Sequence, residues 1–176
     1  LIGTNHEITN RITDASVTGG TMGKPVNNGE VLHAGGRGDG PVVGQIGTRY
    51  LQLAISGTGG RTDLQLVIQG DLTKEEHITL VKNSVNIYEV FITGICTGGA
   101  AGTIGDYTSK RYTGAVRADR LGDLAHVPEV ASTVSNVGNT GTISFVTSTD
   151  YKFIINISEA EDVACSWFAS VKIYQH

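Results

Sequence analysis

The fold of this chain is decided by its last stretch, Cys165-Ser166-Trp167-Phe168-Ala169-Ser170-Val171-Lys172-Ile173-Tyr174-Gln175-His176. Alternate residues of this stretch, from Cys165 through Trp167 to Ile173, are apolar or small, and polar residues fall mainly between them. A period of two is typical of a β-strand with one buried face. The other side also carries Phe168 and Tyr174, which is more aromatic surface than contact with water requires. This excess predicts that a second surface covers the outward side of the strand.

Shorter stretches with the same period recur through residues 41–176, separated by glycine, asparagine and aspartate. Strands spaced by about ten residues, with turn residues between them, are typical of β-sandwiches and barrels rather than of alternating strands and helices. The pattern alone leaves a jelly roll and an up-and-down barrel open. We predict strands over residues 50–55, 64–68, 77–81, 85–92, 111–116, 130–134, 142–146 and 151–157, followed by the closing stretch.

Residues 1–40 differ from the rest because large apolar residues are sparse there and follow no sustained period. Glycine pairs and runs interrupt this segment, and the whole chain holds 24 glycines. A segment of this composition buries too little surface to fold alone. Such a segment is either disordered or lies along another surface, and an extended arm wound with copies of itself would fit. We predict an extended, glycine-rich arm or stalk over residues 1–40 and a β-sandwich domain over residues 41–176.

The charge and the apolar runs of the chain argue against two classes of partner. With 13 Lys and Arg against 17 Asp and Glu, the formal net charge is −4, and the basic residues form no stripe of the kind that binds nucleic acid. No apolar run approaches the roughly 20 residues that cross a bilayer, so we expect no membrane insertion. The chain starts at Leu1 rather than with methionine, and we expect a fragment or a processed product.

The residues with metal-binding or redox chemistry form no motif. Cys96 and Cys165 both fall within apolar strand patterns, and we interpret them as reduced core thiols, with a bridge between their strands as the alternative. Glu159 and Glu161 precede the last strand, and we interpret them as a solvated turn rather than a calcium site. No zinc, phosphate-binding or nucleophile motif is present. We predict no metal site, no cofactor and no enzymatic activity.

The segment 105–112 holds the best candidates for ligand binding, because two of the six tyrosines lie there among charged residues. We predict that it is a loop and that Asp106, Tyr107, Arg111 and Tyr112 contact a ligand. Tyrosine rings stack on sugar rings, while neighbouring polar groups bind hydroxyls. The alternative is an ordinary surface loop whose tyrosines pack at its base.

The end of the chain resembles the C-terminal domains of bacteriophage tail fibres and tailspikes. The resemblance is carried by a strand over residues 151–157 (Tyr-Lys-Phe-Ile-Ile-Asn-Ile), an acidic turn over residues 159–162 and the closing strand from Trp167 to Ile173. It implies a jelly-roll-like antiparallel β-sandwich that forms a homotrimer around a threefold axis. It also implies a place in the tail of a virion, extracellular after release, and contact with host cell-surface polysaccharide.

The residues and the resemblance together favour a domain for trimerisation and host-surface (glycan) attachment in a phage tail fibre or tailspike. Two alternatives stay open. The first is a stand-alone, lectin-like carbohydrate-binding β-sandwich, in which residues 1–40 are a linker. The second is a small glycosidase or a self-cleaving fibre domain, although the sequence shows no catalytic grouping for either reaction.

Overall fold

The structure of the protein is a computed structural model of the whole chain. It describes residues 15–19, 25–37, 45–57, 59–68, 70, 76–119, 124–138, 140–148 and 150–176. Within these ranges, the side chains of residues 34–37, 45–46, 124 and 126–130 are not described. Strands and their connecting segments account for the described residues, and none of them forms a helix with the length and apolar character to cross a membrane.

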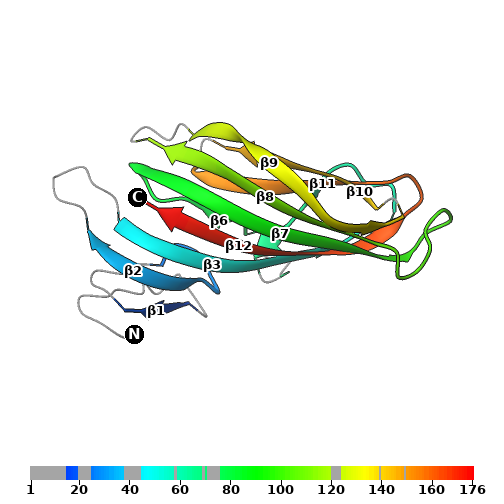
Figure 1. Cartoon of the computed structure of the whole chain (residues 1–176), viewed down its shortest axis with the longest axis horizontal. Coiled ribbons are helices and arrows are strands. Elements are labelled where there is room, and N and C mark those ends of the chain that lie inside the picture. The colour runs from blue at the N-terminus through cyan, green and yellow to red at the C-terminus, as the bar shows by residue number, and fades with distance from the viewer. Residues whose placement is uncertain are drawn as a thin grey trace.

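Twelve strands build the described part of the fold (Figure 1). Each stretch that we predicted as a strand contains one or two of them, and only the first two strands fall where none was expected. They are β1 (Ser16–Thr18), β2 (Val31–Arg37), β3 (Gln45–Ser56), β4 (Leu64–Gln65), β5 (Val67–Ile68), β6 (Ile78–Thr79), β7 (Ser84–Gly98), β8 (Tyr107–Ala118), β9 (Leu124–Val137), β10 (Gly141–Thr147), β11 (Lys152–Glu159) and β12 (Ala164–Gln175).

Eight strands form the larger of two sheets, in the order β1-β2-β3-β12-β7-β8-β9, with β5 also paired to β3. Strands β7, β8 and β9 form an antiparallel meander, and the closing strand β12 lies between β3 and β7. In Figure 1, β12 (red) runs along the sheet between β3 (cyan) and β7 (green). The pairing of β12 extends from Ser166 to Gln175 on the β3 side and from Ala164 to Gln175 on the β7 side. The stretch with the most regular sequence pattern is therefore the middle of this sheet.

The smaller sheet has four strands, in the order β10-β11-β4, with β6 also paired to β11. Strand β11 alternates between half-buried and buried side chains along its whole length, and its inward residues Phe153, Ile155 and Ile157 are at most 1% exposed. These residues belong to one core with the inward residues of the larger sheet. The predicted all-β sandwich is confirmed. With eight and four strands, it is less even than the eight-stranded jelly roll.

Aromatic side chains fill the space between the two sheets. The ring centroids of Tyr88 and Phe153 lie 4.7 Å apart, and those of Phe145 and Phe153 lie 5.5 Å apart. Trp167 is fully buried, as its place in the pattern predicts, and its ring lies over Gly94. A Cβ atom at Gly94 would come within 2.4 Å of the indole ring. Glycine is therefore required in the middle of β7 by close packing rather than by a turn.

Part of the segment that we expected to be an arm belongs to the larger sheet. Strand β2 pairs with β3 in antiparallel fashion, and β1 pairs with β2 in parallel, so both extend the sheet at one edge. For these residues the prediction of an extended arm apart from the sandwich is not met. Residues 1–14, 20–24 and 38–44 of the predicted arm and its boundary lie outside the described residues.

A buried polar cluster ties this segment to the sandwich. The carboxylate of Glu30, which is fully buried, forms an ion pair with Arg49 on β3. Arg49 also donates from Nε to Oε1 of Gln175 on β12 at 2.6 Å. Burial lowers the pKa of Arg49, and the charge of Glu30 opposes that shift. Asn27 binds the backbone of Thr79 twice, at 3.1 and 2.6 Å. This polar cluster and one small apolar contact, between the buried residues Val17 and Leu32, therefore hold the segment, and so few apolar residues gave no pattern in the sequence.

Candidate functional site

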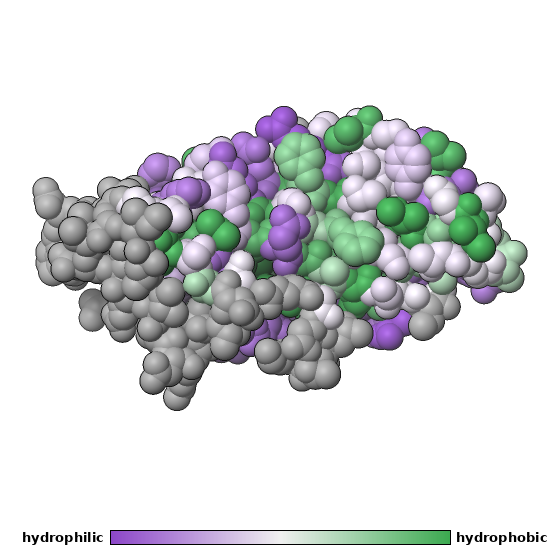
Figure 2. All heavy atoms as spheres, turned by 90° about the horizontal axis from the view of Figure 1, so that it is seen from below, coloured by the Kyte–Doolittle hydropathy of each residue, from purple (hydrophilic) through white to green (hydrophobic). Residues whose placement is uncertain are grey.

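The outward side of the larger sheet is apolar along its central strands. We call it the outer face, and we call the side toward the core the inner face. On β7, Ile87, Phe91 and Ile95 of the outer face are 46%, 48% and 41% exposed, although their neighbours Tyr88 and Ile92 are buried. In the view of Figure 2, apolar side chains gather in the middle of the described surface, with hydrophilic ones between them. Two sets of apolar residues therefore alternate along one strand.

The neighbouring strand continues this apolar surface. Phe168 on β12 is 52% exposed, and its partner in register on β7 is Thr93, two residues from Phe91. Tyr174 on the same side of β12 pairs in register with Ile87. The registers thus place the exposed rings and aliphatic side chains of the two strands side by side. Contiguous apolar surface of this kind on a soluble chain marks a contact surface for another molecule.

Charged side chains of the outer face contact one another or aromatic rings at three positions, Glu89, Arg111 and Lys172. Arg111 on β8 forms an ion pair with Glu89 at 3.4 Å, and its guanidinium lies 5.5 Å from the centre of the Phe91 ring. Lys172 lies with its ammonium 4.4 Å from the centre of the Tyr174 ring, and interaction with Tyr174 raises the pKa of Lys172. Cations that rest on rings and pair with carboxylates cost less to cover than isolated charges.

The four residues predicted as ligand contacts do not form one site. The prediction of a loop over residues 105–112 is wrong from Tyr107 onward, because β8 begins there and pairs with β7 and β9. Tyr112 is 4% exposed and packs edge-on against Phe145, with ring centroids 5.0 Å apart. It lies on the inner face, so its ring is closed to a sugar. Arg111 lies on the outer face with Glu89.

The remaining two predicted residues lie near one end of β8. The hydroxyl groups of Tyr107 and Ser135 are hydrogen-bonded at 2.7 Å, across β8 and β9. Asp106 lies just before β8 and lines a cavity of about 240 Å³ together with Glu161. The first half of β8 is rich in polar residues, so the sequence pattern did not indicate a strand there. Pairing with β7 and β9 stabilises this strand without a strongly apolar pattern.

The acidic turn before β12 also differs from a plain solvated turn. Glu159 is 6% exposed, and its carboxylate accepts hydrogen bonds from the backbone amides of Gly59 at 3.0 Å and Cys165 at 2.9 Å. The side chain therefore holds together the ends of three segments. Among the described residues, no group of three or more histidine, cysteine, aspartate or glutamate side chains is arranged to hold a metal ion.

Cys96 and Cys165 face each other across β7 and β12. They are partners in register, both are buried, and both are free thiols. Burial, followed by the proximity of Cys96, raises the pKa of Cys165 to about 12. A thiol that stays protonated at neutral pH is a poor nucleophile, so this pair is suited to packing rather than to catalysis.

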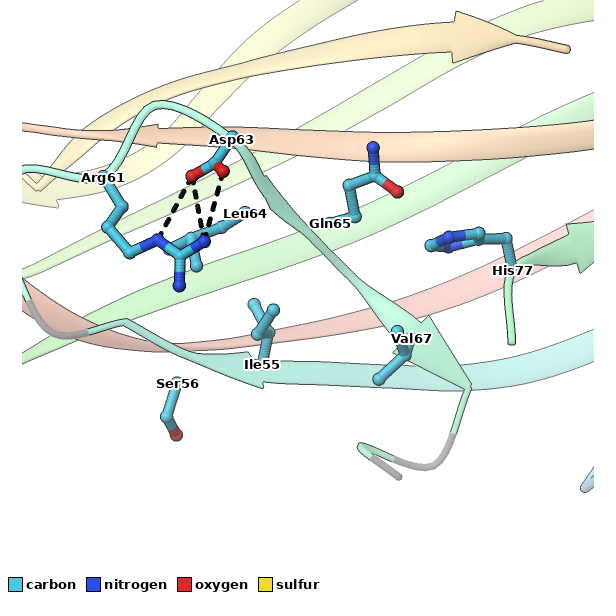
Figure 3. A pocket seen from close by; sticks show the side chains of 8 residues that line it. All are labelled: Ile55, Ser56, Arg61, Asp63, Leu64, Gln65, Val67 and His77. Atoms are coloured by element: carbon cyan, nitrogen blue, oxygen red, sulfur yellow. Dashed lines mark hydrogen bonds and ion pairs between the residues drawn. The ribbon is translucent and has the colours of Figure 1, made fainter. Parts of the chain in front are cut away.

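A cavity of about 450 Å³ lies at the edge of the sandwich (Figure 3). Its walls come from the end of β3, from β4 and β5, and from the residues that precede β4 and β6. In Figure 3, Arg61 and Asp63 face each other at one end, His77 lies at the other, and Ile55 and Val67 lie between. The lining residues are Ile55, Ser56, Arg61, Asp63, Leu64, Gln65, Val67 and His77.

The sequence patterns did not lead us to this cavity, although they contain a signal for it. Arg61, Asp63 and Gln65 are alternate residues of an otherwise apolar and small stretch, so an extended backbone places them on one side. Ile55 and His77, which complete the cavity, are far from them in sequence, and no local pattern brings them together.

No family model matches the sequence, and no curated protein matches it. Among solved structures, the chain is similar to the one titled crystal structure of Acinetobacter baumannii phage AM24 tailspike protein, with a TM-score of 0.41 and 11% sequence identity. The similarity covers 72% of this chain and 26% of that chain. This chain therefore corresponds to about a quarter of the length of the tailspike, and a likeness this weak does not identify a function.

Proposed function

We propose that this chain is a trimerisation and host-surface attachment domain of a phage tail fibre or tailspike. The observation that carries the proposal is the outer face of the larger sheet, where Ile87, Phe91, Ile95 and Phe168 are each between 41% and 52% exposed in a single chain. The resemblance of the last strands to phage fibre domains supports a viral tail as the setting. In this proposal the domain acts by binding and not by catalysis.

Other copies of the same chain are the simplest binding partner for the outer face. Soluble homo-oligomers have closed symmetry, in which every copy buries the same residues. Among the described charges of the outer face, Glu89 pairs with Arg111, and Lys172 and Arg117 leave a small excess of positive charge that a second copy has to accommodate. Three copies with this face toward a shared axis would remove the exposed rings from water. Burial of apolar area is the driving force for such association.

The mass of the assembly tests this proposal. We expect light scattering at micromolar concentration to give three times the chain mass of 18.5 kDa. Sedimentation equilibrium at several loading concentrations then separates a stable trimer from an exchanging one. A mass of one chain at all of these concentrations would overturn the proposed assembly.

A second candidate function is a stand-alone carbohydrate-binding module. It is favoured by the cavity of about 450 Å³, whose size lies within the range of small-molecule sites. The two functions differ in a simple way, since the module would bind glycan as a single chain. A single-chain mass together with retained glycan binding would favour the module over the fibre domain.

A further inference from the structure

We propose that the cavity at the edge of the sandwich binds a neutral, hydroxyl-rich saccharide unit. This inference deepens the proposed attachment function, on which it rests for its biological setting, by naming a site and a chemical class of ligand. The site differs from the residues near β8 that the sequence favoured, since the lining residues come from β3, β4, β5 and the segments next to them.

The cavity exists because one short segment crosses from one sheet to the other. Strand β4 pairs with β11 in the smaller sheet, and β5, one residue later, pairs with β3 in the larger sheet. A segment that changes sheets closes a corner of the sandwich and holds the two layers apart there. Leu64 and Leu66, which are 2% and 0% exposed, fix the segment in the core. The polar residues beside them are thus held on a rigid support.

The charged groups of the cavity balance each other. The guanidinium of Arg61 donates to the carboxylate of Asp63 three times, from Nε at 3.1 Å and from Nη2 at 3.1 and 3.2 Å. The Asp63 side chain is 72% exposed and the Arg61 side chain 50%. A carboxylate or phosphate on a ligand that approached Arg61 would meet the negative charge of Asp63 beside it. A neutral ligand avoids that repulsion.

The other polar groups provide both donors and acceptors. The amide of Gln65 donates and accepts. His77 Nδ1 donates to the backbone oxygen of Leu66 at 3.3 Å, and Nε2 is the ring nitrogen that this hydrogen bond leaves for a ligand. Ser56 also lines the cavity, and its hydroxyl is hydrogen-bonded to that of Ser166 at 3.3 Å. A sugar hydroxyl is itself both donor and acceptor, so it matches this mixture better than a purely anionic or apolar ligand.

An apolar floor completes the match. Ile55 and Val67 lie between the two polar ends of the cavity in Figure 3, and the half-buried Ile55 supplies most of the exposed apolar surface, since Val67 is 2% exposed. A pyranose ring presents C–H groups on its faces and hydroxyl groups around its edge, so its faces fit the floor and its edge fits the polar ends. The exposed rings of β7 and β12 are not among the lining residues of the cavity, and Ile55 shares the inward side of β3 with Leu51 and Leu53. Assembly and sugar binding are therefore compatible.

Nuclear magnetic resonance titration of the whole chain tests the site. The probes are methyl α-glucoside, methyl α-galactoside and N-acetylglucosamine as neutral sugars, and N-acetylneuraminic acid as the anionic comparison. We expect at least one neutral probe to shift the backbone amide signals of Gln65, Val67 and His77 in a saturable way. We expect the anionic probe to shift them less. Failure of all three neutral probes, or stronger binding of the acid, would overturn the proposal.

Two variants and a matched control locate the binding. We expect Gln65→Ala to raise the dissociation constant of the neutral probe by about tenfold, the effect of one lost hydrogen bond. Asp63→Ala should weaken the binding of the neutral probe and strengthen the binding of the anionic one, because it leaves the positive charge of Arg61 without its partner. Gln52→Ala removes the same type of amide group from the outward side of β3 and should leave the dissociation constant of the neutral probe unchanged. Equal effects of Gln65→Ala and Gln52→Ala would place the binding elsewhere and contradict the site.

Light scattering on the same samples separates this inference from the assembly proposal. A trimer without amide shifts would overturn the saccharide site and leave the assembly standing. A single chain that shows the shifts would support the site and overturn the assembly.

Discussion

The two faces of the larger sheet come from the same strands, and both are rich in apolar side chains, yet one is dry and the other is open. Trp167 on the inner face is 0% exposed, whereas its neighbour Phe168 on the outer face is 52% exposed. The outward side of the smaller sheet differs from both, since it carries polar residues such as Thr142 and Ser144. A more polar outward side is therefore available to this sandwich, and the exposed rings of the larger sheet are the contrast on which the proposed assembly rests.

The largest expected loss of stability comes from removing the largest side chain of the inner face. We expect Trp167→Ala to lower the free energy of unfolding by about 3–5 kcal/mol, because the fully buried ring leaves a cavity over Gly94. Urea unfolding followed by far-ultraviolet circular dichroism measures the change. A loss below about 1 kcal/mol would contradict a dry, tightly packed inner face.

The polar end of the inner face should be nearly as sensitive. We expect Glu30→Ala to cost about 3–5 kcal/mol, because it leaves the charge of Arg49 buried without its partner. Asp63→Ala is the matched control, since it breaks the exposed ion pair with Arg61 and should cost no more than about 1 kcal/mol. Urea unfolding of the two variants compares them directly. Equal costs would mean that the segment before β2 is not held as described.

Truncations on the outer face should change association and leave the chain folded. We expect Phe168→Ala and Phe91→Ala each to raise the dissociation constant of the assembly by about tenfold or more, as for central aromatic residues of interfaces. Val146→Ala, at a residue that is 43% exposed on the smaller sheet, is the control and should not change it. Sedimentation equilibrium gives the constants. Unfolding of the phenylalanine variants, or an effect of the control, would remove the distinction between the faces.

The Cys96 and Cys165 pair on the inner face should give the smallest effect, a change in stability with pH. Folding raises the pKa of Cys165 from 9.0 to about 12, so the folded chain holds this proton more tightly than the unfolded chain. The stability that results is complete below about pH 9 and is lost as the pH rises from 9 to about 12. We expect the urea midpoint to fall more between about pH 8 and about pH 11 in the wild type than in Cys165→Ala. Equal falls would show that the thiol titrates normally.

Periodicity predicted the regular part of this fold well. The strands over 50–55, 85–92 and 151–157 and the closing stretch were all evident, because each has one face in the core and alternates accordingly. The same pattern placed Trp167 on the buried side and Phe168 on the open one. A local pattern is sufficient where burial against a single core decides the residue types.

Features that depend on contacts between distant segments were not predictable. Strand β2 escaped notice because Glu30, Arg49 and Gln175 hold it, and these residues lie far apart in the sequence. Tyr112 was mistaken for a surface residue because the polar residues before it suggested a loop, although paired strands on both sides support it. The cavity at β4 required the crossing of a segment between sheets, which follows from topology and not from residue types.

The central place of β12 has a consequence for how the chain is made. This strand leaves the ribosome after all the others, yet it is the one that joins β3 to β7. During translation the growing chain therefore carries open edges on β3 and on β7, each ready to pair with the wrong neighbour. Completion of the larger sheet must wait until β12 emerges, so a stall shortly before Ala164 leaves a nascent chain whose two open edges favour aggregation.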